Sequence, residues 1–151
     1  MMFDAKTHDE AFIKMMHDFV QSHFNQNAST ESFKEVVDRH MTPSMDVEGN
    51  KRMDWFFSQW VYGTDIPRYK FDYTVGESAG SYLVTASLTQ SEVNPNFVAL
   101  VPIYAELDGR TALLGRVRMI GSKTLSDLKL PVPKKPKRVL INANYDVLSR
   151  K

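Results

Sequence analysis

The spacing of the apolar residues changes once along this chain, close to Pro67. Before Pro67, apolar side chains recur three and four residues apart, which is the repeat of one buried face of an α-helix. After it they alternate with polar side chains, which is the repeat of a strand buried on one side. Strand patterns that follow one another through turns, with no helical pattern between them, are typical of antiparallel sheets. The sequence therefore predicts an α+β fold, in which a bundle of about three helices over residues 1–67 precedes an antiparallel β-sandwich over residues 68–151.

Two helices are predicted before Pro43. The first follows a capping box, because the Thr7 hydroxyl can accept from the Glu10 N–H while the Glu10 side chain reaches back to Thr7. Its apolar face consists of Phe12, Met15, Met16, Phe19, Val20, His23 and Phe24. The second begins at Ser29 and Thr30, whose side chains favour the N-cap, and is expected to end at Pro43, since the residue before a proline is pushed out of the α region.

A third helix is predicted over residues 52–62, after a loop at 46–50. Its apolar side is unusually aromatic and consists of Met53, Trp55, Phe56, Phe57, Trp60, Val61 and Tyr62. A helix of about three turns with so many aromatic rings is expected to be largely buried. Gly63 follows it and is expected to take the left-handed position that often ends a helix.

Five strands are predicted, over residues 69–75, 81–90, 97–107, 111–120 and 138–142. The third is apolar on both faces and is therefore expected to be central in its sheet. Residues 76–80 are predicted as a turn, and Asp108-Gly109 is a strong signal for a tight hairpin. No strand is assigned to the stretch that contains Leu125, Leu128, Leu130 and the proline-rich residues 131–136.

Composition excludes several classes of protein. The 151 residues contain no cysteine, which excludes disulfide frameworks, thiolate zinc sites, iron–sulfur clusters and cysteine nucleophiles, and leaves the compartment unindicated. The net charge of +1 gives no general case for binding nucleic acid or a membrane surface, although it combines −3 over residues 1–70 with +4 over residues 71–151. No apolar run reaches the ~20 residues of a membrane span, and the polar, acidic residues 1–6 do not resemble a signal peptide.

The four histidines, His8, His17, His23 and His40, do not form a recognisable metal motif. A helical zinc site of the His-Glu-x-x-His type needs two histidines four residues apart on one face, with the glutamate as base. His17 and His23 are six residues apart and point to different sides, and His8 lies more than two helical turns before His17. We therefore predict no metal site in this chain, and expect these histidines on the surface or beside the helix core.

Few residues suit nucleophilic or acid–base catalysis. The chain has no Gly-x-Ser-x-Gly elbow and no phosphate-binding glycine loop, and Ser81 and Ser122 follow glycines in predicted turns. An independent enzyme would depend on a carboxylate pair. The two pairs that the sequence places close together are Asp4 with Asp9 and Glu106 with Asp108.

Two short motifs suggest partners but have simpler explanations. Residues 133–139 read Pro-Lys-Lys-Pro-Lys-Arg-Val, as in a nuclear-import or nucleic-acid patch. The apolar run 139–141 follows directly and no second basic cluster occurs, so the stretch is predicted to be a solvated linker into the last strand, with no nucleic-acid partner. Asn27-Ala28-Ser29 matches a glycosylation sequon, a pattern that is common by chance.

The aromatic helix carries the one specific resemblance in the chain. Residues 54–67, read as Asp-Trp-Phe-Phe-Ser-Gln-Trp-Val-Tyr-Gly-Thr-Asp-Ile-Pro, resemble the segment that follows the catalytic domain in zinc aminopeptidases of the membrane alanyl aminopeptidase family. The upstream stretches 12–19 and 29–37 resemble the helix pair of that family, and Val101-Pro-Ile-Tyr104 resembles a strand of its β-sandwich. Residues 135–146 resemble the closing segment of bacterial members that lack the large helical C-terminal domain.

The resemblance implies a non-catalytic C-terminal region of a metallopeptidase. The family's His-Glu-x-x-His motif and its transition-state tyrosine are absent from these 151 residues, so no catalytic, metal or cofactor residue is carried over. Zinc and peptide substrates are expected only in a missing catalytic domain, which would be the partner of this chain. In that case Phe12, Phe19, Phe33 and nearby side chains should include some that form an exposed apolar patch.

A rival hypothesis is a free-standing binding module. A β-sandwich can bind peptide or carbohydrate through exposed aromatic side chains, and the candidates are Tyr69, Tyr73, Tyr82 and Tyr104. The simpler alternative is that these four rings belong to the core, where tyrosines of sheets are commonly found. The positions of the four tyrosines therefore bear on the rival hypothesis.

Overall fold

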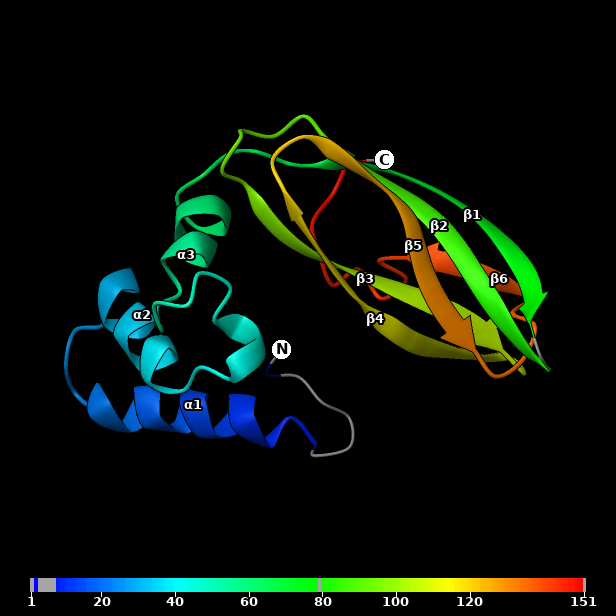
Figure 1. Ribbon diagram of the computed structural model, residues 1–151. Helices are drawn as coiled ribbons and strands as arrows, with labels where there is room; N and C mark the ends of the chain where they lie inside the picture. Colours follow the sequence, from blue (N-terminus) through cyan, green and yellow to red (C-terminus); the bar gives the residue numbers. More distant parts are fainter. Residues whose placement is uncertain (1, 3–7, 79, 151) are drawn as a thin grey trace. The chain divides into compact units, whose positions relative to one another are not determined.

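The computed structural model describes residue 2, residues 8–78 and residues 80–150. The chain divides into two compact units, Met1–Gly63 and Thr64–Lys151, here named the helical unit and the sheet unit. Within the described residues, the helical unit contains three α-helices and the sheet unit contains six antiparallel strands in two sheets (Figure 1). The predicted mixed α+β class is confirmed at this level.

The helical unit is built from short amphipathic helices. They are α1 (Glu10–Ser22), α2 (Thr30–Arg39) and α3 (Asp54–Trp60), with a short 3-10 helix, η1 (Pro43–Met45), between the last two. Each α-helix buries apolar side chains: Met15 in α1, Val36 and Val37 in α2, and Trp55 and Phe57 in α3. Isolated helices of this length are marginal in water, so packing between them must supply most of their stability.

The ends of α2 show one prediction that holds and one that fails. Ser29 caps the helix, since its Oγ accepts the N–H of Ser32 at 3.1 Å and its own N–H donates to Ser32 Oγ at 3.0 Å. The helix ends at Arg39, so the predicted end at Pro43 is wrong. Pro43 instead begins η1, where a missing backbone N–H costs nothing because the first turn of a helix has no internal acceptor for it.

The other two helices differ from the prediction at their ends. The helix α1 begins at Glu10 after Asp9, and Thr7 of the predicted capping box lies outside the described residues. Gly63 does not have a positive φ, so its predicted left-handed conformation is wrong. Gly63 is needed for another reason, because a Cβ there would lie 2.6 Å from the carbonyl oxygen of Gln59 and 2.8 Å from that of Ser58.

The sheet unit contains two three-stranded antiparallel sheets within the described residues. The first has the order β1 (Arg68–Ser78), β2 (Ser81–Ser91), β5 (Lys123–Val132), and the second has the order β4 (Arg110–Ile120), β3 (Val98–Leu107), β6 (Arg138–Ile141). The strand β3 pairs on both sides and is buried on both faces, which confirms its predicted central place. The strand β5 was not predicted from the sequence, and it completes the first sheet.

Residues of both sheets contribute to one apolar core. In β2 the side chains are buried at every second position, from Val84 through Ala86 and Leu88 to Gln90, as strict alternation predicts. The central buried cluster consists of Val84, Ala86, Ile103, Val132 and Val139. This cluster therefore combines side chains of β2 and β5 from the first sheet with side chains of β3 and β6 from the second.

The predicted turns are confirmed at one hairpin and shifted at another. Asp108 and Gly109 both have a positive φ, 49° and 76°, as a tight two-residue hairpin requires. Gly76 lies inside β1 opposite Leu83, so the predicted turn over residues 76–80 begins too early. The strand continues to Ser78, and the positive φ of 79° falls at Gly80.

Candidate functional site

The histidines are placed apart from one another in the helical unit. The imidazole of His40 pairs with Asp18 at 2.7 Å, and its hydrogen bond lowers the pKa of that carboxyl. His23 Nδ1 lies 3.0 Å from the Phe19 carbonyl oxygen, while the other two histidines, His8 and His17, are exposed. Among residues 2, 8–78 and 80–150, no three or more histidine, aspartate or glutamate side chains lie close enough together to hold a metal ion.

Both carboxylates of the Glu106/Asp108 pair form ion pairs with the basic stretch at residues 133–139. Glu106 accepts from Arg138 Nε at 2.6 Å and lies 3.5 Å from Lys137 Nζ, and the Arg138 hydrogen bond lowers its pKa. Asp108 pairs with Lys134 Nζ at 2.6 Å. Each carboxylate is thus neutralised by its own cation, which suits ion pairing rather than proton transfer. The same contacts hold Lys134, Lys137 and Arg138 against the end of β3 and the turn that follows it.

Other residues singled out from the sequence show no shared site. Asp4 lies outside the described residues, so the Asp4/Asp9 pair is not placed. Ser122 Oγ donates to the carbonyl oxygen of Val93 at 3.2 Å. Ser29 of the sequon serves as the N-cap of α2.

Most of the candidate binding tyrosines are at least half-buried in the sheet unit. Tyr104 is buried and donates to Asp146 Oδ2 at 2.6 Å; burial, followed by this hydrogen bond, raises the pKa of its phenol. Tyr69 is half-buried, and burial strongly raises the pKa of its phenol. Tyr82 packs against the central cluster, and Tyr73 is 38% exposed. These four rings do not form one exposed aromatic surface.

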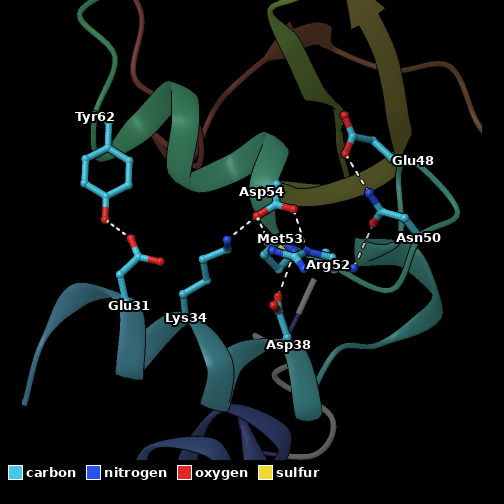
Figure 2. A network of polar contacts seen from close by, with 9 residues as sticks. All are labelled: Glu31, Lys34, Asp38, Glu48, Asn50, Arg52, Met53, Asp54 and Tyr62. Carbon is cyan, nitrogen blue, oxygen red and sulfur yellow. Dashed lines mark hydrogen bonds and ion pairs between the residues drawn. The ribbon is translucent and has the colours of Figure 1, made fainter.

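A network of polar contacts joins α2 to α3 and was not predicted from the sequence (Figure 2). At its centre Asp54, the first residue of α3, pairs with Lys34 of α2 and accepts from Arg52 Nε at 2.6 Å. The hydrogen bonds from Arg52 and Lys34 lower the pKa of Asp54. Asp38 of α2 accepts the N–H of Met53 at 2.7 Å, which satisfies a donor at the beginning of α3.

Three further hydrogen bonds extend this network at its sides (Figure 2). The Tyr62 hydroxyl donates to Glu31 Oε1 at 2.5 Å, and this hydrogen bond raises the pKa of the phenol. Asn50 accepts the N–H of Arg52 at 2.8 Å and donates to Glu48 at 3.1 Å. Each carboxylate in the figure faces a donor of the same unit, and none faces a nucleophile. The network therefore positions α3 against α2 and does not resemble a catalytic arrangement.

Contacts between aromatic rings connect α1 to α2 and α2 to α3. The ring centroids of Phe19 and Phe33 are 5.0 Å apart, and those of Phe33 and Phe57 are 6.3 Å apart. Phe56 contacts both Phe57 and Trp55 edge to face, at 5.7 and 5.8 Å. Edge-to-face pairs of this kind add stability beyond the area they bury. The indole Nε1 of Trp55 donates to the Met45 carbonyl oxygen at 3.2 Å, which fixes the ring in the unit.

A second side of α1 remains exposed although it is apolar. Ile13, Val20 and Phe24, seven and four residues apart, are 59%, 56% and 69% exposed. Ile13 and Val20 lie within α1 at a spacing that places them on one side of the helix, whereas Phe24 lies in the turn beyond the end of α1 at Ser22. The three phenylalanines named as candidates for an exposed patch, Phe12, Phe19 and Phe33, are half-buried. The exposed apolar side chains at α1 and just beyond it are therefore Ile13, Val20 and Phe24, and not these three phenylalanines.

Comparison with known proteins does not assign the chain to a family. No protein-family model matches it, and no curated protein matches it either. Among the described helices, none is both long enough and apolar enough to cross a membrane.

Proposed function

We propose that this chain is the non-catalytic C-terminal part of a zinc aminopeptidase-like protein, with a structural and docking role behind the peptidase active site. In this proposal the chain itself supplies no catalytic residue and no zinc ligand. Zinc and peptide substrate would be bound by a catalytic domain of the same polypeptide, which would be the direct partner of the helical unit. The proposal begins from the resemblance of residues 54–67 and from the surface of α1.

The observation that carries the proposal is the exposure of three large apolar side chains, Ile13 and Val20 in α1 and Phe24 just beyond its end. Each large apolar side chain that leaves water contributes about 1.5–3 kcal/mol, so two exposed on one side of α1 and a third just beyond its end favour association with another surface. An α1 covered evenly by polar residues would have spoken against a missing partner. These three side chains belong to the unit that the resemblance places beside the catalytic domain.

The arrangement within each unit also supports the proposal. We infer that the three helices form a small bundle, since aromatic rings connect α1, α2 and α3 in sequence. We infer that the two sheets form a β-sandwich, since side chains of both contribute to one buried cluster. A bundle followed by a sandwich is the order that the resemblance implies.

The decisive experiment is a reconstitution. The natural reading frame is extended upstream, and the residues that precede this chain are expressed separately as the partner. We expect this chain alone to show no aminopeptidase activity on alanine p-nitroanilide with added zinc, and to co-purify with the upstream partner. Activity of this chain alone would refute the proposal. An upstream sequence without a His-Glu-x-x-His motif would refute it equally.

Matched variants assign the docking to α1. The double variant Val20→Asp/Phe24→Ser changes only exposed side chains, so it should fold normally while it lowers the binding of a hydrophobic dye and abolishes co-purification. The control Lys14→Ser/Gln21→Asp changes two exposed polar positions of the same helix and should retain both. Equal co-purification of the two variants would exclude α1 as the docking surface.

A further inference from the structure

The sheet unit has a groove where the segment after β6 returns towards the beginning of β1. Its volume is about 420 Å³, and the residues that line it include Tyr69, Tyr145, Leu148 and Arg150. The segment, residues 142–150, is drawn in orange to red in Figure 1. The proposed docking role of the helical unit does not use this groove.

The segment that forms the groove is held by hydrogen bonds within itself, to β3 and to the residue that precedes β1. The side-chain amide of Asn142 donates to the Val147 carbonyl oxygen at 2.6 Å and accepts the Val147 N–H at 2.9 Å. Asp146 accepts from the Tyr104 hydroxyl. The N–H of Arg150 donates to the carbonyl oxygen of Pro67 at 2.8 Å. The groove is therefore preformed, which reduces the entropy that a ligand would have to overcome.

Tyr145 has a left-handed backbone conformation at a turn, which its N–H closes by donating to the Asn142 carbonyl oxygen at 3.0 Å. Its φ is 57°, in the left-handed region that side chains with a Cβ disfavour. Its side chain is 87% exposed, so its ring gains little from burial. Leu148, which is 61% exposed, also lines the groove. A strained backbone that holds an aromatic ring in solvent beside a groove points to a role in binding.

The charge beside the groove favours an anion. Arg68 and Arg150 share one carboxylate, that of Glu92, so these two guanidinium groups are not both neutralised by it. Arg68 Nε lies 2.7 Å from Glu92, whereas Arg150 reaches the carboxylate only at 3.4 Å through one Nη atom. Arg150 lines the groove and is 56% exposed at its side chain, so most of its guanidinium donors remain available to a ligand.

We propose that this groove binds a peptide segment in which an aromatic side chain stands beside a carboxylate. The ring would pack against Tyr145 and Leu148, and the carboxylate would accept hydrogen bonds from Arg150, a charge-assisted pairing for which guanidinium is well suited. The carboxylate could belong to the C-terminus of the peptide or to an adjacent acidic residue. This proposal is independent of the docking role of α1, because it depends only on residues of the sheet unit.

Amide-resolved NMR titration of the complete chain tests the proposal. The probes are acetyl-Gly-Gly-Phe with a free C-terminus, acetyl-Gly-Phe-Glu-amide, and acetyl-Gly-Gly-Phe-amide as the uncharged control. We expect shifts concentrated at residues 142–150 and at Tyr69, with at least one carboxylate peptide binding roughly tenfold more tightly than the amide. The first two probes distinguish a C-terminal from a side-chain carboxylate. Equal binding of all three, or shifts scattered over both units, would overturn the proposal.

Variants separate binding from folding. Tyr145→Gly removes the ring and relieves the left-handed strain, so its Tm should be unchanged or higher while affinity for the tighter-binding peptide falls about tenfold. Arg150→Gln should remove the preference for the carboxylate. Phe24→Ser and Arg118→Gln, at exposed positions outside the groove, should leave the Kd unchanged within about twofold. Unchanged affinity in Tyr145→Gly, or shifts at the groove that depend on protein concentration alone, would contradict the assignment.

Discussion

The two units of this chain hold their elements together in different ways. In the sheet unit, backbone ladders join strands far apart in sequence, and they enclose fully buried side chains such as Phe97, Ile103 and Met119. In the helical unit the backbone hydrogen bonds of each helix are local, so side chains alone connect the helices. Among the largest side chains that are fully buried in the described residues, only Val36 belongs to the helical unit. The helical unit, with so small a core, therefore gains more from an external partner than the sheet unit does. The following predictions test this difference between the two units.

The largest effect is expected from Trp55→Ala in the helical unit. Trp55 is 5% exposed, contacts Phe56, and donates its indole N–H to Met45. Removal of such a ring costs about 3–5 kcal/mol, which is comparable with the whole stability of a small unit. We expect the helical unit to unfold while the sheet unit stays folded, as followed by amide-resolved NMR and circular dichroism.

The matched control is Phe24→Ala, which removes a ring that is 69% exposed. Its effect on the free energy of unfolding should stay within about 0.5 kcal/mol. If the sheet-unit amides of Trp55→Ala also lost their chemical-shift dispersion in the NMR spectrum, the two units would unfold together. In that case the helical unit and the sheet unit would not have separate free energies of unfolding.

The position of the aromatic helix and most of the strands could be predicted, because each depends on a local repeat. The strand β5 could not, because its apolar residues Leu125, Leu128 and Leu130 are three and then two residues apart. The structure gives the reason: the register with β2 shifts between Ala86 and Leu88, and Asp127 has a φ of 58°. A β-bulge of this kind inserts a residue and resets the alternation that identifies a strand.

The polar network and the groove were also beyond the reach of local patterns. Lys34 and Asp54 are twenty residues apart, and Tyr62 and Glu31 are thirty-one residues apart, so no spacing rule connects either pair. Tyr145 follows an asparagine-containing stretch that reads as an ordinary terminal loop. Only its positive φ and its exposure beside a groove single it out, and both are properties of the folded chain.

The next largest effect should fall in the sheet unit, at its buried polar residue Gln90. Gln90 is 1% exposed, accepts from the Tyr69 hydroxyl at 3.0 Å and donates to the Gly121 carbonyl oxygen at 2.8 Å. Gln90→Leu would keep the volume but leave both partners unsatisfied, at about 1–3 kcal/mol for each group that stays buried. We expect a lower urea midpoint for the sheet unit alone.

A double-mutant cycle checks the mechanism. Adding Tyr69→Phe to Gln90→Leu removes one of the two orphaned groups, so the double variant should be less destabilised than the sum of the single variants. Strict additivity would mean that the Tyr69–Gln90 hydrogen bond does not matter for the stability of the sheet unit.

A smaller effect is expected from Gly63→Ala at the end of the helical unit. The new Cβ would lie 2.6 Å from the Gln59 carbonyl oxygen, a backbone atom that cannot move without disturbing the end of α3. Crowding of this type costs about 1–2 kcal/mol, and we expect it as a lower thermal midpoint of the helical unit. Gly76→Ala is the matched control, because a Cβ there meets nothing within 4 Å and the backbone has no positive φ. Equal destabilisation by both substitutions would mean that flexibility, not contact, explains Gly63.

The smallest effect concerns acid, and it compares one carboxylate from each unit. Hydrogen bonds from Arg52 hold the pKa of Asp54 below its usual 3.8, and the hydrogen bond from Arg138 holds that of Glu106 below its usual 4.5. A carboxyl with a lowered folded-state pKa contributes stability that is complete above its unfolded pKa and is lost as the pH falls through the folded value. Both contributions should therefore decline below about pH 4, and the exposure of these ion pairs keeps them small. Asp54→Asn should flatten the acid dependence of the urea midpoint in the helical unit alone, and Glu106→Gln in the sheet unit alone, measured by amide-resolved NMR between about pH 7 and about pH 3. A response of both units to either substitution would show that they share one folding transition, and the independent stabilities assumed for them would have to be abandoned.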